Sequence, residues 1–148
     1  IEALQGKVRK KGISVLDVGT GSGILSIAAA RLGAAEVLGL DIDRAAIEMA
    51  KENVRQNNVS EIVKIRKGRI GDIRKRFDVV VANLDLRSLK RMRMPLIRHL
   101  KSKAFIILSG ILEEEKERIL QYYMKTGLLQ WIEVAQEGEW VCLTLKKK

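Results

Sequence analysis

The sequence predicts an α/β protein built on a doubly wound, mostly parallel sheet of about seven strands that ends in a C-terminal antiparallel hairpin. Short apolar runs alternate with longer amphipathic runs along the 148 residues. Strands separated by helices of about ten or more residues pair in parallel through right-handed crossovers. A glycine-rich turn joins the first apolar run to the first helical one. The last two extended segments are separated by a short polar turn, which is typical of a hairpin.

The individual elements follow from hydrophobic periodicity and from turn residues. After a short helical opening, apolar runs predict strands at 13–18, 36–40, 62–65, 78–82 and 104–108. Apolar residues at helical spacing predict helices at 24–32, 44–57 and 113–126, with Gly33 and Gly127 where glycines commonly end helices. The spacing also predicts a helix between Arg87 and His99 that is interrupted or re-entered at Pro95, the only proline. Extended segments at 128–135 and 140–145 complete the set, with a hairpin turn at 136–139.

The composition is that of one ordinary globular domain spanning residues 1–148. The chain is 47% hydrophobic and 31% charged, which supplies enough apolar residues for a core that folds alone. No apolar run approaches the roughly 20 residues that cross a bilayer, and no export signal precedes the first strand. We therefore expect a cytoplasmic protein without a membrane segment. Nothing in the sequence indicates an oligomeric state.

Four side chains are assigned structural roles. The single cysteine, Cys142, lies in an alternating apolar segment, and Trp131 and Trp140 are interpreted as core residues of the hairpin. The single histidine, His99, is interpreted as solvated on a helix. One cysteine and one histidine exclude a metal site built from these residues and a Ser-His-Asp arrangement, so we expect chemistry without a metal.

The formal net charge of +10 is largely concentrated in two stretches. The first holds Arg66, Lys67, Arg69, Arg74, Lys75 and Arg76, and the second holds Arg87, Lys90, Arg91, Arg93, Arg98, Lys101 and Lys103. Such clusters raise encounter rates with anionic partners such as ribosomal RNA. They are also common on the solvated surfaces of proteins from hot environments. Aromatic residues, which would stack on bases, make up only 4% of the chain, so both interpretations stay open.

The strongest functional signal is the junction Asp17-Val18-Gly19-Thr20-Gly21-Ser22-Gly23 between the first strand and the first helix. Glycines lack a Cβ, so the backbone can turn sharply and approach a ligand, while the amides at the helix start face an acceptor. Asp41 ends the next strand about 20 residues further on, where a carboxylate accepts hydrogen bonds from ribose hydroxyls. The loop and the acid together predict a nucleoside-containing cofactor.

Details of the loop narrow the class of cofactor. Its spacing is G-x-G-x-G, with Ile24 where a dinucleotide loop has a third glycine. It also lacks the lysine and the following serine or threonine of a Walker loop, which argues against ATP bound in that way. Asp17 would repel a phosphate, whereas its charge suits a ligand with a cationic amino group and a sulfonium.

These motifs resemble those of the class I S-adenosylmethionine methyltransferases. The resemblance rests on the segment from Val15 to Leu25 and on Gly39-Leu40-Asp41-Ile42-Asp43. Within that class the chain is most similar to the ribosomal protein L-eleven methyltransferases of the PrmA type, through residues 77–83, 108–112 and Glu139-Trp140. The resemblance covers nearly the whole chain. It implies the Rossmann-like methyltransferase fold, S-adenosylmethionine as cofactor, and amines of a ribosomal protein as methyl acceptors.

The resemblance also implies roles for individual residues. Gly19, Thr20 and Gly21 would line the methionine part of the cofactor, Asp41 would bind the ribose, Ile42 would pack on the adenine, and Asn83 would sit at the transfer point. Together with Asp17 and Gly23 of the same loop, these are the candidate cofactor-binding residues.

Asn83 and Asp85 are the candidate catalytic residues. The carbonyl of Asn83 would accept a hydrogen bond from an incoming amine, and Asp85 would hold the substrate's positive charge or take its proton. Each also has a structural interpretation: Asn83 as a cap of the following helix, and Asp85 as a cap or a surface charge.

The chain departs from the family in three respects. It carries neither the N-terminal domain that recognises the ribosomal protein nor the threonine- and histidine-containing loop, so we expect the catalytic domain alone. Leu84-Asp85-Leu86 stands where the family usually has aliphatic residues, and Arg69 lies near where many relatives place an acid. An RNA methyltransferase and a non-catalytic cofactor-binding module are therefore alternative functions.

Overall fold

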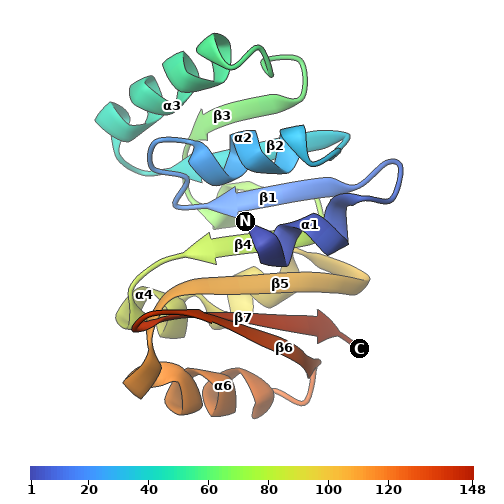
Figure 1. Cartoon of the computed structure of the whole chain (residues 1–148), viewed down its shortest axis with the longest axis vertical. Helices are drawn as coiled ribbons and strands as arrows, with labels where there is room; N and C mark the ends of the chain where they lie inside the picture. The colour runs from blue at the N-terminus through green and yellow to red at the C-terminus, as the bar shows by residue number, and fades with distance from the viewer.

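A central seven-stranded sheet forms the middle layer of the protein (Figure 1). The computed structural model describes residues 1–148. The strand order is β3-β2-β1-β4-β5-β7-β6, with parallel pairing from β3 to β5. β7 pairs antiparallel with both β5 and β6. The predicted doubly wound, mostly parallel sheet with a C-terminal antiparallel hairpin is therefore confirmed.

The elements follow the predicted alternation closely. The strands are β1 (Ser14–Val18), β2 (Glu36–Asp41), β3 (Val63–Lys67), β4 (Phe77–Asn83), β5 (Leu100–Leu112), β6 (Leu129–Glu137) and β7 (Trp140–Lys147). The helices are α1 (Glu2–Val8), α2 (Ile24–Arg31), α3 (Arg44–Gln56), α4 (Leu86–Arg91), α5 (Arg93–Arg98) and α6 (Lys116–Met124), with short 3-10 turns η1 (Ile70–Asp72) and η2 (Glu113–Glu115). None of the helices combines the length and the apolar character needed to cross a membrane.

Helices cover both faces of the sheet. α1, α2 and α3 pack on one face around a core cluster that includes Val15 and Ile27. The connection through η1, together with α4, α5 and α6, packs on the other face around a cluster that includes Leu16 and Leu89. Because neighbouring residues of a strand point to opposite faces, β1 supplies both clusters and is buried along its whole length.

The helical segment after β4 is broken at Met92 and is re-entered just before Pro95, in agreement with the second of the two predicted alternatives. Pro95 lies in the first turn of α5, where its missing N–H leaves no intrahelical hydrogen bond unmade. In one continuous helix, the proline ring would clash with the carbonyl of Arg91. The chain therefore ends α4 with the Met92 N–H bonded to the Ser88 carbonyl at 2.9 Å, and it restarts at Arg93.

His99 is not a solvated side chain, so that interpretation is wrong. The half-buried ring follows the end of α5, and its two nitrogens lie 2.7 Å from the backbone oxygens of Pro95 and Ile73. The contact with Ile73 joins α5 to the connection between β3 and β4. The sequence did not predict it because the two residues are 26 positions apart.

The core positions predicted for the two tryptophans are also wrong. Trp131 is 51% exposed and Trp140 is 52% exposed. β6 forms the edge of the sheet, and apart from Leu129 all its residues are exposed, so apolar alternation in this strand does not correspond to a buried face. Cys142 on the neighbouring β7 is half-buried and packs at the margin of a core cluster.

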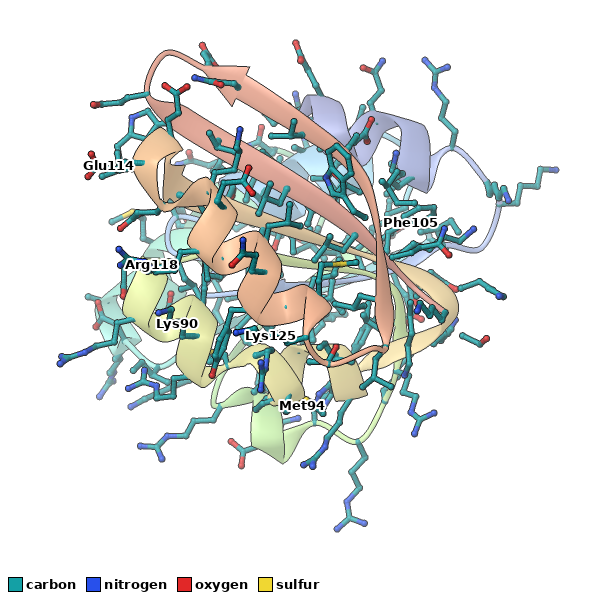
Figure 2. The ribbon with its side chains drawn as sticks, turned by 90° about the horizontal axis from the view of Figure 1, so that it is seen from below. Lys90, Met94, Phe105, Glu114, Arg118 and Lys125 are labelled. Carbon is teal, nitrogen blue, oxygen red and sulfur yellow. The ribbon has the colours of Figure 1, made fainter.

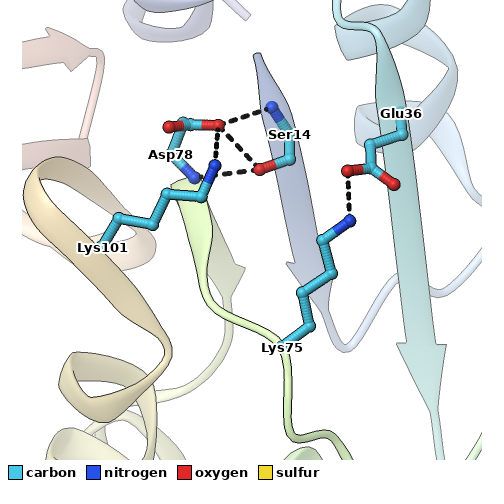
Figure 3. A network of polar contacts seen from close by, with 5 residues as sticks. All are labelled: Ser14, Glu36, Lys75, Asp78 and Lys101. Carbon is cyan, nitrogen blue, oxygen red and sulfur yellow. Dashed lines mark hydrogen bonds and ion pairs between the residues drawn. The ribbon is translucent and has the colours of Figure 1, made fainter. Parts of the chain in front are cut away.

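A polar network fastens the N-terminal ends of three strands (Figure 3). Asp78 Oδ2 accepts hydrogen bonds from the Ser14 amide (2.9 Å), the Ser14 hydroxyl (2.7 Å) and the Lys101 ammonium (2.8 Å). Burial by itself would raise the pKa of Asp78, but the bonds from Lys101 and Ser14 outweigh burial and lower it. The exposed Lys75–Glu36 ion pair lies beside this network.

Asp78→Asn should lower the free energy of unfolding by about 1 kcal/mol at pH 7, because a neutral amide makes weaker hydrogen bonds to Lys101 and Ser14. A carboxyl with a lowered folded-state pKa stabilises fully above its unfolded pKa and loses that contribution as pH falls. The gap between the two proteins should therefore shrink below about pH 4. Urea unfolding at several pH values measures it, with Glu36→Gln in the exposed pair as the control. An effect of equal size in Glu36→Gln would contradict the assignment.

Candidate functional site

The site lies where the C-terminal ends of β2, β1 and β4 meet. Val18 of β1 pairs with Leu40 of β2 on one side and with Ala82 of β4 on the other. The next residue of each strand or loop is therefore at the same level. In this way the fold brings Gly19, Asp41 and Asn83 to one edge of the sheet, as expected for ligand sites in such sheets.

The glycine loop is held against β2 by its backbone. The amides of Gly19 and Thr20 both donate to the Leu40 carbonyl at 2.8 Å. Gly19 has a φ of 73°, and a Cβ at this position would lie 2.6 Å from Leu84 Cδ2. The absence of a side chain at Gly19 thus serves packing against Leu84. Gly21 is the loop glycine beside open space, because nothing lies within 4 Å of where its Cβ would be.

The Asp17 carboxylate is buried beneath the loop, with a residue exposure of only 1%. Its Oδ2 accepts hydrogen bonds from the hydroxyls of Thr20 and Ser26, each at 2.7 Å. Its Oδ1 is buried and has no hydrogen-bond partner. Burial raises the pKa of Asp17 despite the hydroxyl bonds, and the nearby Asp41 charge also raises it. The carboxylate therefore keeps one uncompensated oxygen directly beneath the glycine loop.

Asp41 connects the glycine loop to the start of α3. Its Oδ2 accepts from the Gly21 amide and its Oδ1 accepts from the Asp43 amide, both at 3.0 Å. Each carboxylate oxygen has about two lone-pair sites, so both oxygens keep capacity for a further donor such as a hydroxyl. Ile42 next to it is 68% exposed. The segment that contains Arg69 borders the same corner, because the Gly68 amide donates to the Asp41 carbonyl at 2.9 Å.

Asn83 and Asp85 differ in their surroundings. Asp85 is the N-cap of α4 and accepts from the Ser88 amide (3.0 Å) and hydroxyl (2.8 Å), which lower its pKa. Its structural interpretation as a cap is therefore confirmed, and its lowered pKa makes it a poor proton acceptor. Asn83 is exposed and does not cap the helix, so that interpretation of Asn83 is wrong.

Two residues that shape the site were not predicted from the sequence. Ser26 supplies the second hydroxyl to Asp17, and Gly110 lies at a bulge in β5, where a Cβ would be 2.8 Å from Asn83 Oδ1. Both carry a local signal. Ser26 is a polar residue inside an apolar helical run, and a glycine within a strand often marks a bulge or a close approach of backbone.

An open pocket of about 890 Å³ adjoins Asn83. It is enclosed by the N-terminus of α1, the loop after β4, the bulge in β5 and the tip of the β6–β7 hairpin. Its lining includes the acids Glu2, Asp85 and Glu137 as well as Trp140, and it includes no lysine or arginine. No group of three or more His, Cys, Asp or Glu side chains is arranged to hold a metal ion.

The strand order of the sheet, with the glycine loop, Asp41 and Asn83 at one edge, is that of the class I methyltransferase fold. The family description "Ribosomal protein L11 methyltransferase (PrmA)" matches residues 1–148, so the chain belongs to the ribosomal protein L11 methyltransferase family.

Individual relatives agree with this assignment. The ribosomal protein L11 methyltransferases of Geobacter metallireducens and Caldicellulosiruptor bescii are 44% and 42% identical, over 97% and 100% of this chain. The chain covers 46% and 47% of those proteins, so it spans about half the length of the curated relatives it matches.

Solved structures share the fold. The ribosomal protein L11 methylase of Lactobacillus delbrueckii subsp. bulgaricus matches with a TM-score of 0.90 at 32% identity, covering 99% of this chain and 76% of that chain. The [4+2]-cyclase SpnF matches with a TM-score of 0.79 at 14% identity, over 99% of this chain and 79% of that chain. The second match shows that this fold by itself does not determine the reaction.

Asp17→Asn should make the protein at least as stable as the wild type at pH 7, because a neutral amide replaces a buried carboxylate with an unpaired oxygen. A carboxyl whose folded-state pKa is raised destabilises increasingly as pH rises from about 4 through that pKa. The variant should lose this pH dependence. Thermal unfolding between pH 3 and pH 8 measures it, and a variant clearly less stable than wild type at pH 7 would show that the charge is compensated.

Proposed function

We propose that residues 1–148 are one S-adenosylmethionine-dependent methyltransferase domain, which transfers a methyl group to an amine of a ribosomal protein. The observation that carries the proposal is the alignment of the glycine loop, Asp41 and Asn83 at one sheet edge, beside a pocket whose lining includes three acids and no lysine or arginine. Membership of the L11 methyltransferase family supports both the reaction and the acceptor. The cytoplasmic location expected from the sequence stays a prediction.

The residues at the glycine loop fit the cofactor. The unpartnered Asp17 Oδ1 suits the ammonium of a methionine moiety, and the free acceptor capacity of Asp41 suits the two ribose hydroxyls. The exposed side chain of Ile42 offers an apolar surface to the adenine. Gly19, Thr20, Gly21 and Gly23 would line the methionine side of the cofactor with loop backbone. When bound, S-adenosylmethionine supplies a methyl group activated by a sulfonium.

The chain's own residues align the acceptor amine and stabilise its charged form before and after the transfer. Methyl transfer needs a neutral amine held in line, because the lone pair of nitrogen forms the new bond. Asn83 lines the pocket, and its amide oxygen can accept an N–H bond and so orient that lone pair. Asp85, with its lowered pKa, stabilises the positive charge of an approaching or product ammonium, and the released proton passes to solvent.

The pocket lining favours an amine over an RNA group as acceptor. Glu2, Asp85 and Glu137 attract a cation and repel the phosphates that flank any nucleotide acceptor. RNA methylation remains the alternative that the basic stretches suggest. A non-catalytic module is the third possibility, and it differs by binding the cofactor without transferring a methyl group.

Asp41→Asn should raise the dissociation constant for S-adenosylmethionine at least about tenfold, because one acceptor oxygen for the ribose becomes a donor. Titration calorimetry measures the change. Asp43→Asn is the matched control, since it removes the same charge two residues away while asparagine still caps α3. If the two variants bind the cofactor equally well, Asp41 is not a ribose ligand.

Asn83→Ala should lower kcat at least about a hundredfold while cofactor affinity stays within about threefold, because it removes the group that orients the amine. Asp85→Asn keeps an N-cap and removes the charge, so it should act mainly by raising KM for the acceptor. Transfer of a labelled methyl group to ribosomal protein measures both. Unchanged activity in Asn83→Ala would remove Asn83 from the mechanism.

A further inference from the structure

The net positive charge of the protein lies in one segment, from Lys64 to Lys103, which we call the basic segment. It holds 14 lysines and arginines and 3 acids, a net charge of +11. The other 108 residues hold 14 basic and 15 acidic residues, a net charge of −1. The net charge of the chain therefore comes from the segment that runs from β3 to the start of β5.

The fold gathers the connections of the basic segment on one face of the sheet. Ile70 and Ile73 between β3 and β4 belong to the same core cluster as Leu89 of α4 and Leu96 of α5. The His99–Ile73 contact at 2.7 Å ties the two connections together. Figure 2 shows Lys90 on α4 from this side of the molecule, with Arg118 and Lys125 on the neighbouring α6.

Most cations of the basic segment have no carboxylate partner. Only Lys75, with Glu36, and Lys101, with Asp78, form ion pairs. The surfaces of proteins from hot environments gain stability from networks in which both signs of charge alternate. The unpaired cations here repel one another instead, so stability does not account for them.

The composition of this surface points to a phosphate backbone. None of the exposed large hydrophobic residues of the protein lies between Lys64 and Lys103, so the surface lacks the apolar contacts that membranes and protein interfaces require. It also lacks exposed aromatic residues, on which unpaired bases would stack. Eight of its 14 cations are arginines, whose planar guanidinium groups pair well with phosphate.

We propose that the basic segment is a docking surface for the phosphate backbone of double-helical RNA. The choice of RNA over DNA rests on the proposed function, because a ribosomal protein acceptor works beside folded RNA. Arg87 lies two residues after Asp85, so bound RNA would border the transfer pocket. The acids that line the pocket keep the RNA outside it, and the RNA is therefore a docking partner and not the methyl acceptor.

The test measures binding of a fluorescein-labelled RNA duplex of about 20 base pairs. Fluorescence anisotropy reports the binding at KCl concentrations from about 50 to about 200 mM, without any cofactor. Binding should weaken steeply with salt. Arg87→Gln, Lys90→Gln and Arg91→Gln combined should weaken it at least about tenfold and reduce the log–log salt slope by about 3. The combined Arg69→Gln, Arg74→Gln and Arg76→Gln variant, in the connection between β3 and β4, should give a similar loss.

The matched control combines Arg9→Gln, Lys10→Gln and Lys11→Gln, three exposed cations outside the basic segment, with the same change of net charge. It should bind RNA within about twofold of wild type. The proposal is overturned if wild type does not bind the duplex at the lowest salt, if the control loses as much affinity as the other two variants, or if a DNA duplex of the same length binds more tightly. Because no methyl transfer is measured, failure here is separate from failure of the proposed enzyme activity.

Discussion

The parallel pairing of β1 with β2 and β4 positions every candidate group of the site. Since Val18 faces Leu40 and Ala82 across the sheet, the chain leaves all three strands at one level. A slip of one residue in either pair would turn the buried side chains of that strand to the opposite face. Burial of β1 on both faces therefore fixes the register, and the register fixes the geometry of the site. In this sense the core of the protein determines the distances between its functional loops.

The buried carboxylate of Asp17 lowers the free energy of unfolding locally. A carboxylate that is 1% exposed carries a large desolvation penalty, and two hydroxyl bonds to one oxygen only partly offset it. Replacement by an apolar residue would suit the core better, yet the position directly precedes the loop that borders the open corner at Gly21. A cationic ligand group at Oδ1 would remove part of the penalty, so ligand binding and loop stability are linked.

The fold could be predicted from the sequence because strand and helix periods are local properties, and alternating strands and helices imply parallel pairing. The failures share one cause. The exposure of Trp131 depends on β6 being the edge of the sheet, and the contact of His99 with Ile73 depends on a residue far along the chain. The break at Met92 depends on where α5 can begin relative to Pro95. The pocket beside Asn83 could not be predicted because it is assembled from five separate parts of the chain.

The distribution of charge gives the two sides of the site edge different roles. Residues 1–63, which include α1, α2 and α3, carry eight basic and eight acidic residues, whereas the basic segment carries all of the net positive charge. Fields of exposed charges decay over about 8 Å at physiological salt, so the acidic pocket and the basic surface act on different groups of one partner. Under the two proposals, a cationic side chain would be drawn toward Asn83 while a polyanion would be held along α4. A complex of a basic protein with RNA contains both a cationic side chain and a polyanion. An uncharged acceptor or a purely anionic one does not contain this pair.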